Sequence, residues 1–283
     1  MRKTTFLAGL MLLMFGCEKA SDIGSQGIPP DLVVVDGIIT DEQKAHLVKL
    51  TSPVADPDDT PVPVTGAVVM IYDADSTWNL TELPDNSGYY YSPAWFLPVV
   101  GRTYTLLIRA AGKLLTAKST LTNPLAFFRA RYVKGSNGLY HIQAASNPYN
   151  PSRAAMYKVN LDWSFLPAYS NQNPDDCRAV VYYYTLPTLD VNEILAPTSE
   201  TVWFPVGTHV VETRYSLSDE HAAFIRALLL NTTWNGGLFD GDQASLPTNL
   251  NEGGAGFFGA CGVVTRTFFV LPEEKSTNFE KNQ

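Results

Sequence analysis

The feature that most restricts the fold of this chain is a succession of short runs of β-branched and aromatic residues, separated by turn residues. Each run has the length of an ordinary strand, and none shows the 3.6-residue period of a helix. Between residues 31 and 122 the runs are Leu32–Thr40, Ala45–Thr51, Ala67–Asp73, Gly88–Ser92, Tyr104–Arg109 and Leu114–Lys118. Strands at this spacing predict a β-sandwich domain of about seven strands over residues 31–122.

A second mainly-β domain is expected over residues 123–272. The sequence Leu121-Thr122-Asn123-Pro124 marks the boundary, because proline cannot join a central strand and biases the preceding residue away from helix. One α-helix, at about 219–230, is predicted in this domain, since a serine can cap it and acidic residues suit its first turn. Residues 273–283 form a polar tail. Strand-like runs lie at 127–133, 139–144, 156–165, 179–186, 200–204, 209–215 and 262–271.

The N-terminus has the order of an export signal. Arg2 and Lys3 precede an apolar run, and Gly16-Cys17 follows it. The run is shorter than the roughly 20 residues of a membrane-spanning helix, so we expect residues 1–16 to be removed as a signal peptide. Cys17 at this place resembles the lipobox of bacterial lipoproteins, in which a diacylglyceryl group is attached to the cysteine. The alternative is a buried cysteine closing a core segment.

Residues 17–30 follow this cysteine with Ser, Gly, Gln, Pro and mixed charges, which indicates a flexible tether. Glu18, rather than an aspartate, follows Cys17 and favours the outer membrane. A periplasmic and a surface-facing orientation both stay open.

Charge and cysteine content narrow the class of protein further. The chain holds 20 basic and 28 acidic residues, a net charge of −8. A chain this acidic lacks the positively charged surface with which proteins bind nucleic acid. The two cysteines besides Cys17 are Cys177 and Cys261. They form either a disulfide, which an oxidising compartment permits, or two buried free thiols, and both alternatives stay open.

Several short motifs, in this order, resemble one known family. They are residues 32–41, Pro63–Val69, Gly88-Tyr89-Tyr90, Gly101–Leu106, Leu115-Thr116-Ala117 and Asn249–Ala260. Together they resemble the Bacteroidota lipoprotein family called domain of unknown function 4249. The first half is also similar to the transthyretin-like, carboxypeptidase-regulatory type of sandwich. The resemblance implies an Ig/transthyretin-like N-terminal domain, an outer-membrane lipoprotein and a gene beside a TonB-dependent transporter, with no settled activity and no site residues to carry over.

Candidate ligand-binding residues are few. Tyr182, Tyr184, Trp234 and Phe239 are aromatics that could stack on a ligand or anchor an interface, with core packing as the alternative. Asp240 and Asp242 are the best pair for calcium, against the alternative of a solvated turn.

No cofactor and no metal other than this weak calcium candidate is expected. Gly254–Gly259 matches the dinucleotide pattern G-x-G-x-x-G, but no strand leads into it and no helix follows. The four histidines lack the spacing of zinc ligands.

These observations favour a non-enzymatic accessory lipoprotein of the outer membrane that assists a TonB-dependent transporter by binding its substrate or its barrel. Two alternatives stay open. One is a cell-surface glycan or peptide hydrolase, whose paired carboxylates cannot be identified from spacing alone. The other is a structural adhesin or envelope-assembly protein.

Overall fold

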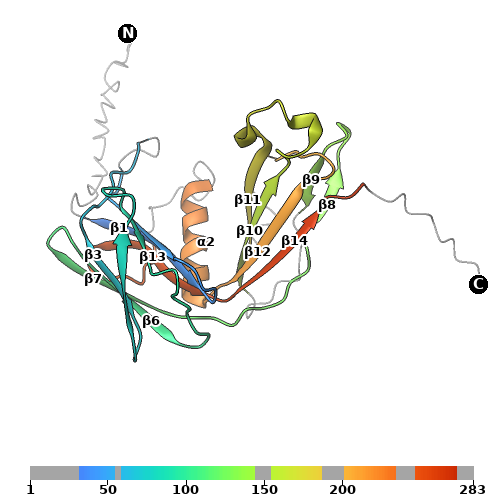
Figure 1. Cartoon of the computed structure of the whole chain (residues 1–283). Helices are drawn as coiled ribbons and strands as arrows, with labels where there is room; N and C mark the ends of the chain where they lie inside the picture. The colour runs from blue at the N-terminus through green and yellow to red at the C-terminus, as the bar shows by residue number, and fades with distance from the viewer. Residues whose placement is uncertain (1–31, 55–58, 144–153, 187–200, 234–245, 273–283) are drawn as a thin grey trace, which may run out of the picture.

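The computed structural model describes residues 32–54, 59–143, 154–186, 201–233 and 246–272. These residues form a mainly-β protein with one α-helix, as the sequence predicts. Figure 1 shows two β-sheet lobes with the helix between them. The first-sheet strands are β1 (Val33–Thr40), β2 (Leu47–Thr51), β3 (Val68–Tyr72), β4 (Thr77–Glu82), β5 (Tyr89–Tyr91), β6 (Thr103–Ala110), β7 (Lys113–Thr120) and β13 (Gly254–Cys261).

The first sheet has eight strands in the order β13-β1-β2-β5-β4-β3-β6-β7. Its strands alternate buried and exposed positions, so that one face of the curled sheet surrounds a single apolar core. Within this core Phe96 packs against Trp78 and Tyr104 at ring-centroid distances of 4.3 and 5.9 Å. The predicted seven strands of residues 31–122 are all present, including β4, for which the sequence analysis gave no separate run.

The strand β13 corrects the predicted division at residue 122. Residues 254–261 were assigned to the second domain, yet β13 pairs in parallel with β1 along its whole length, from Val33 opposite Gly254 to Thr40 opposite Cys261. The first sheet is therefore completed by the C-terminal part of the chain. The chain passes directly from one lobe to the other here, since only one residue separates β13 of the first sheet from β14 of the second.

Two glycines explain why a glycine-rich segment forms this strand. Gly256 has φ +87°, and a Cβ there would lie 2.0 Å from the carbonyl oxygen of Val35. A Cβ on Gly259 would lie 2.5 Å from the ring of His221, which packs over it. Close approach of β1 on one side and of the helix on the other thus requires glycine at both positions.

The second sheet has four antiparallel strands in the order β11-β10-β12-β14. Their bounds are β10 (Ala155–Asp162), β11 (Arg178–Thr185), β12 (His209–Ser216) and β14 (Val263–Phe269). A separate hairpin of β8 (Arg131–Lys134) and β9 (Tyr140–Gln143) covers one face, with η2 (Pro167–Tyr169) and η3 (Pro174–Cys177) between β10 and β11. The predicted strand at 200–204 is reduced to a single bridge between Phe204 and Tyr140.

The helix α2 (Asp219–Thr233) begins where the sequence predicts and ends three residues later. Ser218 accepts a hydrogen bond from the backbone N–H of His221, which caps the first turn. Its apolar side packs with residues of both sheets, among them Ile38 and Met156. No helix of the described ranges is long and apolar enough to cross a membrane.

Candidate functional site

The second sheet has one covered face and one open face, because side chains alternate along each strand. On the covered face Val159, Leu161 and Val210 are fully buried beneath the β8–β9 hairpin. The opposite face points toward α2 and the first sheet (Figure 1). We call it the open sheet face.

The strand registers place the side chains of the open sheet face in four rows that run from β11 to β14. The rows are Arg178–Asp162–His209–Phe269, Val180–Asn160–Val211–Thr267, Tyr182–Lys158–Thr213–Thr265 and Tyr184–Met156–Tyr215–Val263. The last row is half-buried, with Met156, Tyr184 and Tyr215 packed beside Phe224 of α2. The other three rows keep exposed side chains at both ends, and no element among the described residues covers them.

The middle of the open sheet face carries groups that suit a polar ligand. Thr213 and Thr265 join their hydroxyls at 3.0 Å, and Lys158 lies beside Thr213 in the same row. Tyr182, at the β11 end of this row, is 47% exposed and presents its ring to solvent. Hydroxyls, an ammonium group and an aromatic ring on one rigid surface can bind a ligand by hydrogen bonds and by stacking.

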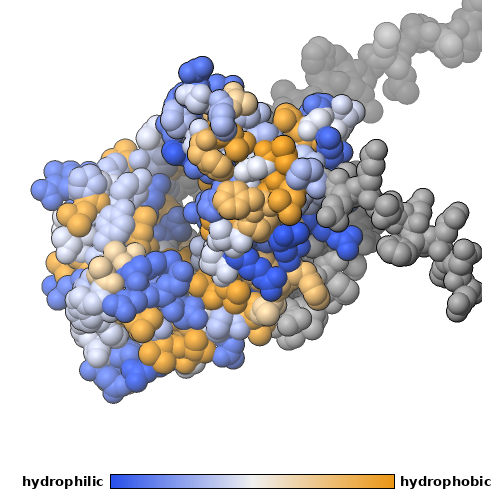
Figure 2. All heavy atoms as spheres, turned by 45° about the vertical axis from the view of Figure 1, so that its right-hand side comes forward, coloured by the Kyte–Doolittle hydropathy of each residue, from blue (hydrophilic) through white to orange (hydrophobic). Residues whose placement is uncertain are grey.

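One corner of the open sheet face, where its first row ends on β14, is aromatic. Phe269 is 52% exposed and contacts the ring of Phe165 edge-on at 6.2 Å and the ring of His209 at 5.0 Å. On the side of the second lobe that Figure 2 brings forward, away from α2, apolar side chains are interspersed with hydrophilic ones. The first row is therefore aromatic at its β14 end, while an ion pair of Arg178 with Asp162, at 3.1 Å, forms its β11 end.

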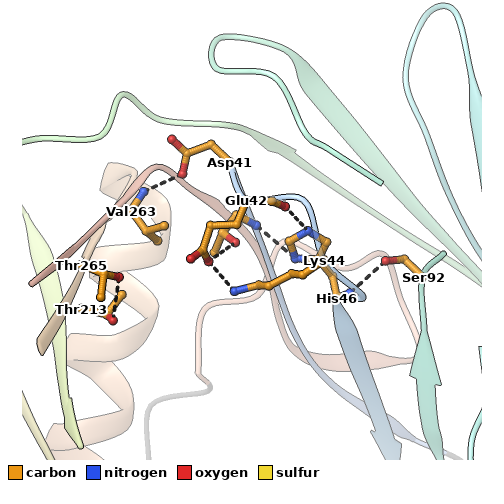
Figure 3. A network of polar contacts seen from close by, with 9 residues as sticks. Asp41, Glu42, Lys44, His46, Ser92, Thr213, Val263 and Thr265 are labelled. Atoms are coloured by element: carbon orange, nitrogen blue, oxygen red, sulfur yellow. Dashed lines mark hydrogen bonds and ion pairs between the residues drawn. The ribbon is translucent and has the colours of Figure 1, made fainter. Parts of the chain in front are cut away.

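The turn between β1 and β2 forms a rim beside this face (Figure 3). Asp41 accepts a hydrogen bond from the backbone N–H of Val263 at 2.8 Å, which joins the turn to the start of β14. Glu42 pairs with Lys44 and accepts a hydrogen bond from Thr40 at 3.0 Å. The rim thus places the Asp41 carboxylate at the first residue of β14, and Glu42 acts electrostatically on Tyr215 in the neighbouring strand.

His46 holds this turn in one conformation. Its Nδ1 accepts from the backbone N–H of Thr40 at 3.3 Å, and its Nε2 faces the carbonyl of Glu42 at 3.2 Å. Both contacts are satisfied by the neutral ring with its proton on Nε2. Burial is the main cause that lowers the pKa of His46 to about 4.

Burial and neighbouring charges set the protonation states of Tyr215, in the half-buried row, and of Glu42, in the rim. Burial raises the pKa of Tyr215 to about 12, with Glu42 and Tyr182 acting in the same direction. Burial alone would also raise the pKa of Glu42, but the hydrogen bond and charge of Lys44 outweigh it and lower that pKa. At neutral pH the tyrosine is protonated and Glu42 is charged.

The pair Cys261 and His221 is the arrangement closest to a catalytic dyad among the described residues. The Sγ of Cys261 lies 3.6 Å from the Nδ1 of His221, and both side chains are buried. Burial raises the pKa of Cys261 to about 12 and lowers that of His221 to about 4. An activated thiolate needs the opposite shifts, so this neutral pair serves packing.

Glu212 is another buried ionisable group of the second lobe, on the covered face. The hydroxyl of Tyr183 donates to it, and the backbone N–H of Ala130 donates at 3.1 Å. Burial raises its pKa, although Arg266 and Arg129 act in the opposite direction. Because its side chain is fully buried, Glu212 fixes the connecting segment at Ala130 to the sheet and is closed to ligands.

The structure brings together only part of the predicted site. Tyr182 and Tyr184 both lie on the open sheet face, exposed and half-buried respectively. Cys17, Trp234, Phe239, Asp240 and Asp242 lie outside the described residues. In the described ranges no three or more His, Cys, Asp or Glu side chains gather as a metal site.

Of the two alternatives for the cysteines, the structure has the free thiols. Cys177 and Cys261 are buried free thiols. Cys177 belongs to the core beneath the β8–β9 hairpin, whereas Cys261 ends β13 beside α2. The two thiols thus lie in separate apolar clusters.

Sequence reasoning missed the threonines and Lys158 of the open sheet face. They stand on three strands, and only the register brings them into one row. The alternation of each strand was the available signal, but it does not say which face is covered.

The sequence matches the model of a protein family. A family model described as Domain of unknown function (DUF4249) matches residues 20–267. The matched range spans every described strand except the last two residues of β14. A search of curated proteins finds no match.

Proposed function

This chain belongs to the family described as Domain of unknown function (DUF4249), and on that premise we propose that it is a non-enzymatic binding lipoprotein of the outer membrane. In this proposal a lipid on Cys17 anchors the chain, and the two β lobes assist a TonB-dependent transporter by binding its substrate or its barrel. The observation that carries the proposal is the open sheet face, with its exposed Tyr182 and its row of hydroxyl and ammonium groups.

The rigidity of this face supports a binding role. All four strands are paired in continuous register over seven or eight residue pairs, and the opposite face is fixed by a buried core. A surface held in this way loses little conformational freedom when a ligand binds, which favours affinity. The side chains that meet a ligand thus stand on strands rather than on loops.

The surroundings of the face also support a binding role. The rim at Asp41 and Glu42 and the helix α2 both border the half-buried row that ends at Tyr184 and Val263, so the first lobe adjoins the open sheet face along this row. The tether of residues 17–30 spans at most roughly 45 Å when extended, which keeps the face within reach of a neighbouring membrane protein.

Co-purification tests the proposal. The full-length protein is cross-linked in cells, extracted from the outer membrane with detergent and captured through a C-terminal tag. Recovery of a TonB-dependent transporter supports the proposal, and extraction from the inner membrane or recovery without a transporter contradicts it.

A matched pair of variants then locates the contact. The double substitution Tyr182→Ala and Lys158→Ala removes the ring and the charge from one row of the face. The control Trp95→Ala removes an aromatic that is 65% exposed on the first lobe. We expect the double variant to lower transporter recovery at unchanged protein level, whereas the control leaves it unchanged.

A further inference from the structure

Both edges of the first sheet are sealed by the chain itself. The side chain of Asn249 donates to the carbonyls of Lys118 on β7 and Phe258 on β13, at 3.0 and 2.8 Å. Asn251 pairs with Thr116 of β7 through its backbone and its side chain, at 3.1 and 2.7 Å. These contacts satisfy outward-facing backbone groups that could otherwise pair with another strand.

The edge strand β11 of the second sheet has no such seal among the described residues, where β10 is its one neighbouring strand. The N–H of Trp163 donates to the carbonyl of Cys177 at 2.9 Å, and these two residues stand opposite each other in the β10–β11 register. Hydrogen-bonded and non-hydrogen-bonded pairs alternate along an antiparallel ladder, so this bond shows which pairs are hydrogen-bonded. Odd-numbered residues of β11 consequently bond to β10. The backbone N–H and C=O groups of Val180, Tyr182 and Tyr184 point away from the sheet.

The composition of β11 makes this edge unusual. The run Ala179-Val-Val-Tyr-Tyr-Tyr-Thr185 contains no charge, no proline and no glycine. Exposed edges are ordinarily protected by charges, proline or bulges, since an uncharged run with high β-propensity invites pairing. The opposite edge, β14, has such protection: Arg266 is exposed in its middle, and Asp41 binds the N–H of Val263.

We propose that β11 pairs antiparallel with β11 of a second copy of this chain, about a two-fold axis at Tyr182. This axis places the seven uncharged residues of one copy opposite the same seven of the other, so that no like charges meet. Identical strands satisfy each other's outward groups, as an isologous interface requires. The dimer joins two four-stranded sheets and extends the open sheet face across both copies. This inference goes beyond the proposed function and needs no ligand.

Cysteine cross-linking tests the register directly. In the proposed pairing, Tyr182 of one copy faces Tyr182 of the other with a Cα separation of roughly 5.5 Å, which a disulfide spans. The purified full-length Tyr182→Cys protein in mild detergent should form a disulfide-linked dimer under mild oxidation. Thr267→Cys, at the opposite edge of the sheet, is the control and should stay monomeric on a non-reducing gel.

Sedimentation of two lysine variants tests the interface without a cross-link. Val180 and Thr267 are exposed at opposite ends of the same row. Val180→Lys should weaken dimerisation about tenfold, because two charges enter a neutral interface, whereas Thr267→Lys should not change it. Circular dichroism confirms that both variants are folded. A monomeric wild-type protein at tens of micromolar, or a dimer that Val180→Lys leaves intact, overturns the proposal.

Discussion

Replacing His221 with phenylalanine should remove a defined part of the acid sensitivity of the fold. His221 is 4% exposed, stacks on Phe257 at 4.7 Å and lies over Gly259. Burial lowers its pKa from 6.5 to about 4. The folded protein therefore holds this ring neutral, while the unfolded chain protonates it below about pH 6.5.

The sign and size of the effect follow from this difference. Between pH 6.5 and 4 the unfolded state binds more protons at His221, so its contribution is complete above pH 6.5 and is lost as the pH falls toward 4. The drop in pKa corresponds to about 3 kcal/mol over the whole range, and to about 2 kcal/mol between pH 7.5 and 5. Cys261 stays neutral throughout, since burial raises its pKa to about 12.

Urea unfolding followed by tryptophan fluorescence at several pH values between 5 and 7.5 measures this contribution. Phenylalanine keeps the stacking on Phe257, so any packing cost of His221→Phe is the same at each pH. Wild-type protein should lose about 2 kcal/mol more than the variant between pH 7.5 and 5. His46 is present in both proteins, so its contribution to the pH dependence cancels in the difference between them. If the unfolding free energies of the two proteins fall in parallel with pH, His221 is not held neutral in the folded state.

Three further predictions concern the first sheet and the thiols. Asn249→Ala removes the bridge between β7 and β13 and should lower the unfolding free energy by about 2–3 kcal/mol in urea titration; an unchanged midpoint would show that the edges close without it. Gly256→Ala should prevent the pairing of β1 with β13, because the new Cβ meets Val35 O at 2.0 Å; limited proteolysis would detect this as rapid cleavage, and wild-type resistance would contradict it. The lipidated protein should show no reactive thiol when folded and two in denaturant without reductant, from Cys177 and Cys261; no thiol in denaturant would mean a disulfide.

Much of the fold could be predicted because strand length and alternation are local properties. Runs such as Leu32–Thr40 and His209–Tyr215 appear as β1 and β12 with small shifts of their ends. The helix could be predicted because Ser218, Asp219 and Glu220 form a recognisable N-terminus.

The strand β13 could not be predicted in the same way. Gly254, Gly256 and Gly259 resemble a loop, since glycine ordinarily weakens a strand. Only the approach of β1 and His221, from segments distant in sequence, makes glycine necessary there. The division into two domains was inexact for the same reason, because a long-range parallel pairing leaves no local signal.

The candidate site shows the same limit. Tyr182 stood out as one of three consecutive tyrosines, and its exposure could not be told from that of Tyr183, which is half-buried on the covered face. Lys158, Thr213 and Thr265 are ordinary residues individually. They become a candidate binding surface only because the strand register aligns them in one row across three strands.

Site-specific photo-cross-linking in intact cells shows whether the open sheet face contacts a transporter or its substrate. A photoreactive amino acid is placed at Thr267 on the open sheet face or at Leu114 on the first sheet, which is 50% exposed. We expect an adduct with a TonB-dependent transporter or with its substrate from position 267 and none from position 114. Adducts from position 114 alone, or no adduct from position 267, would contradict it.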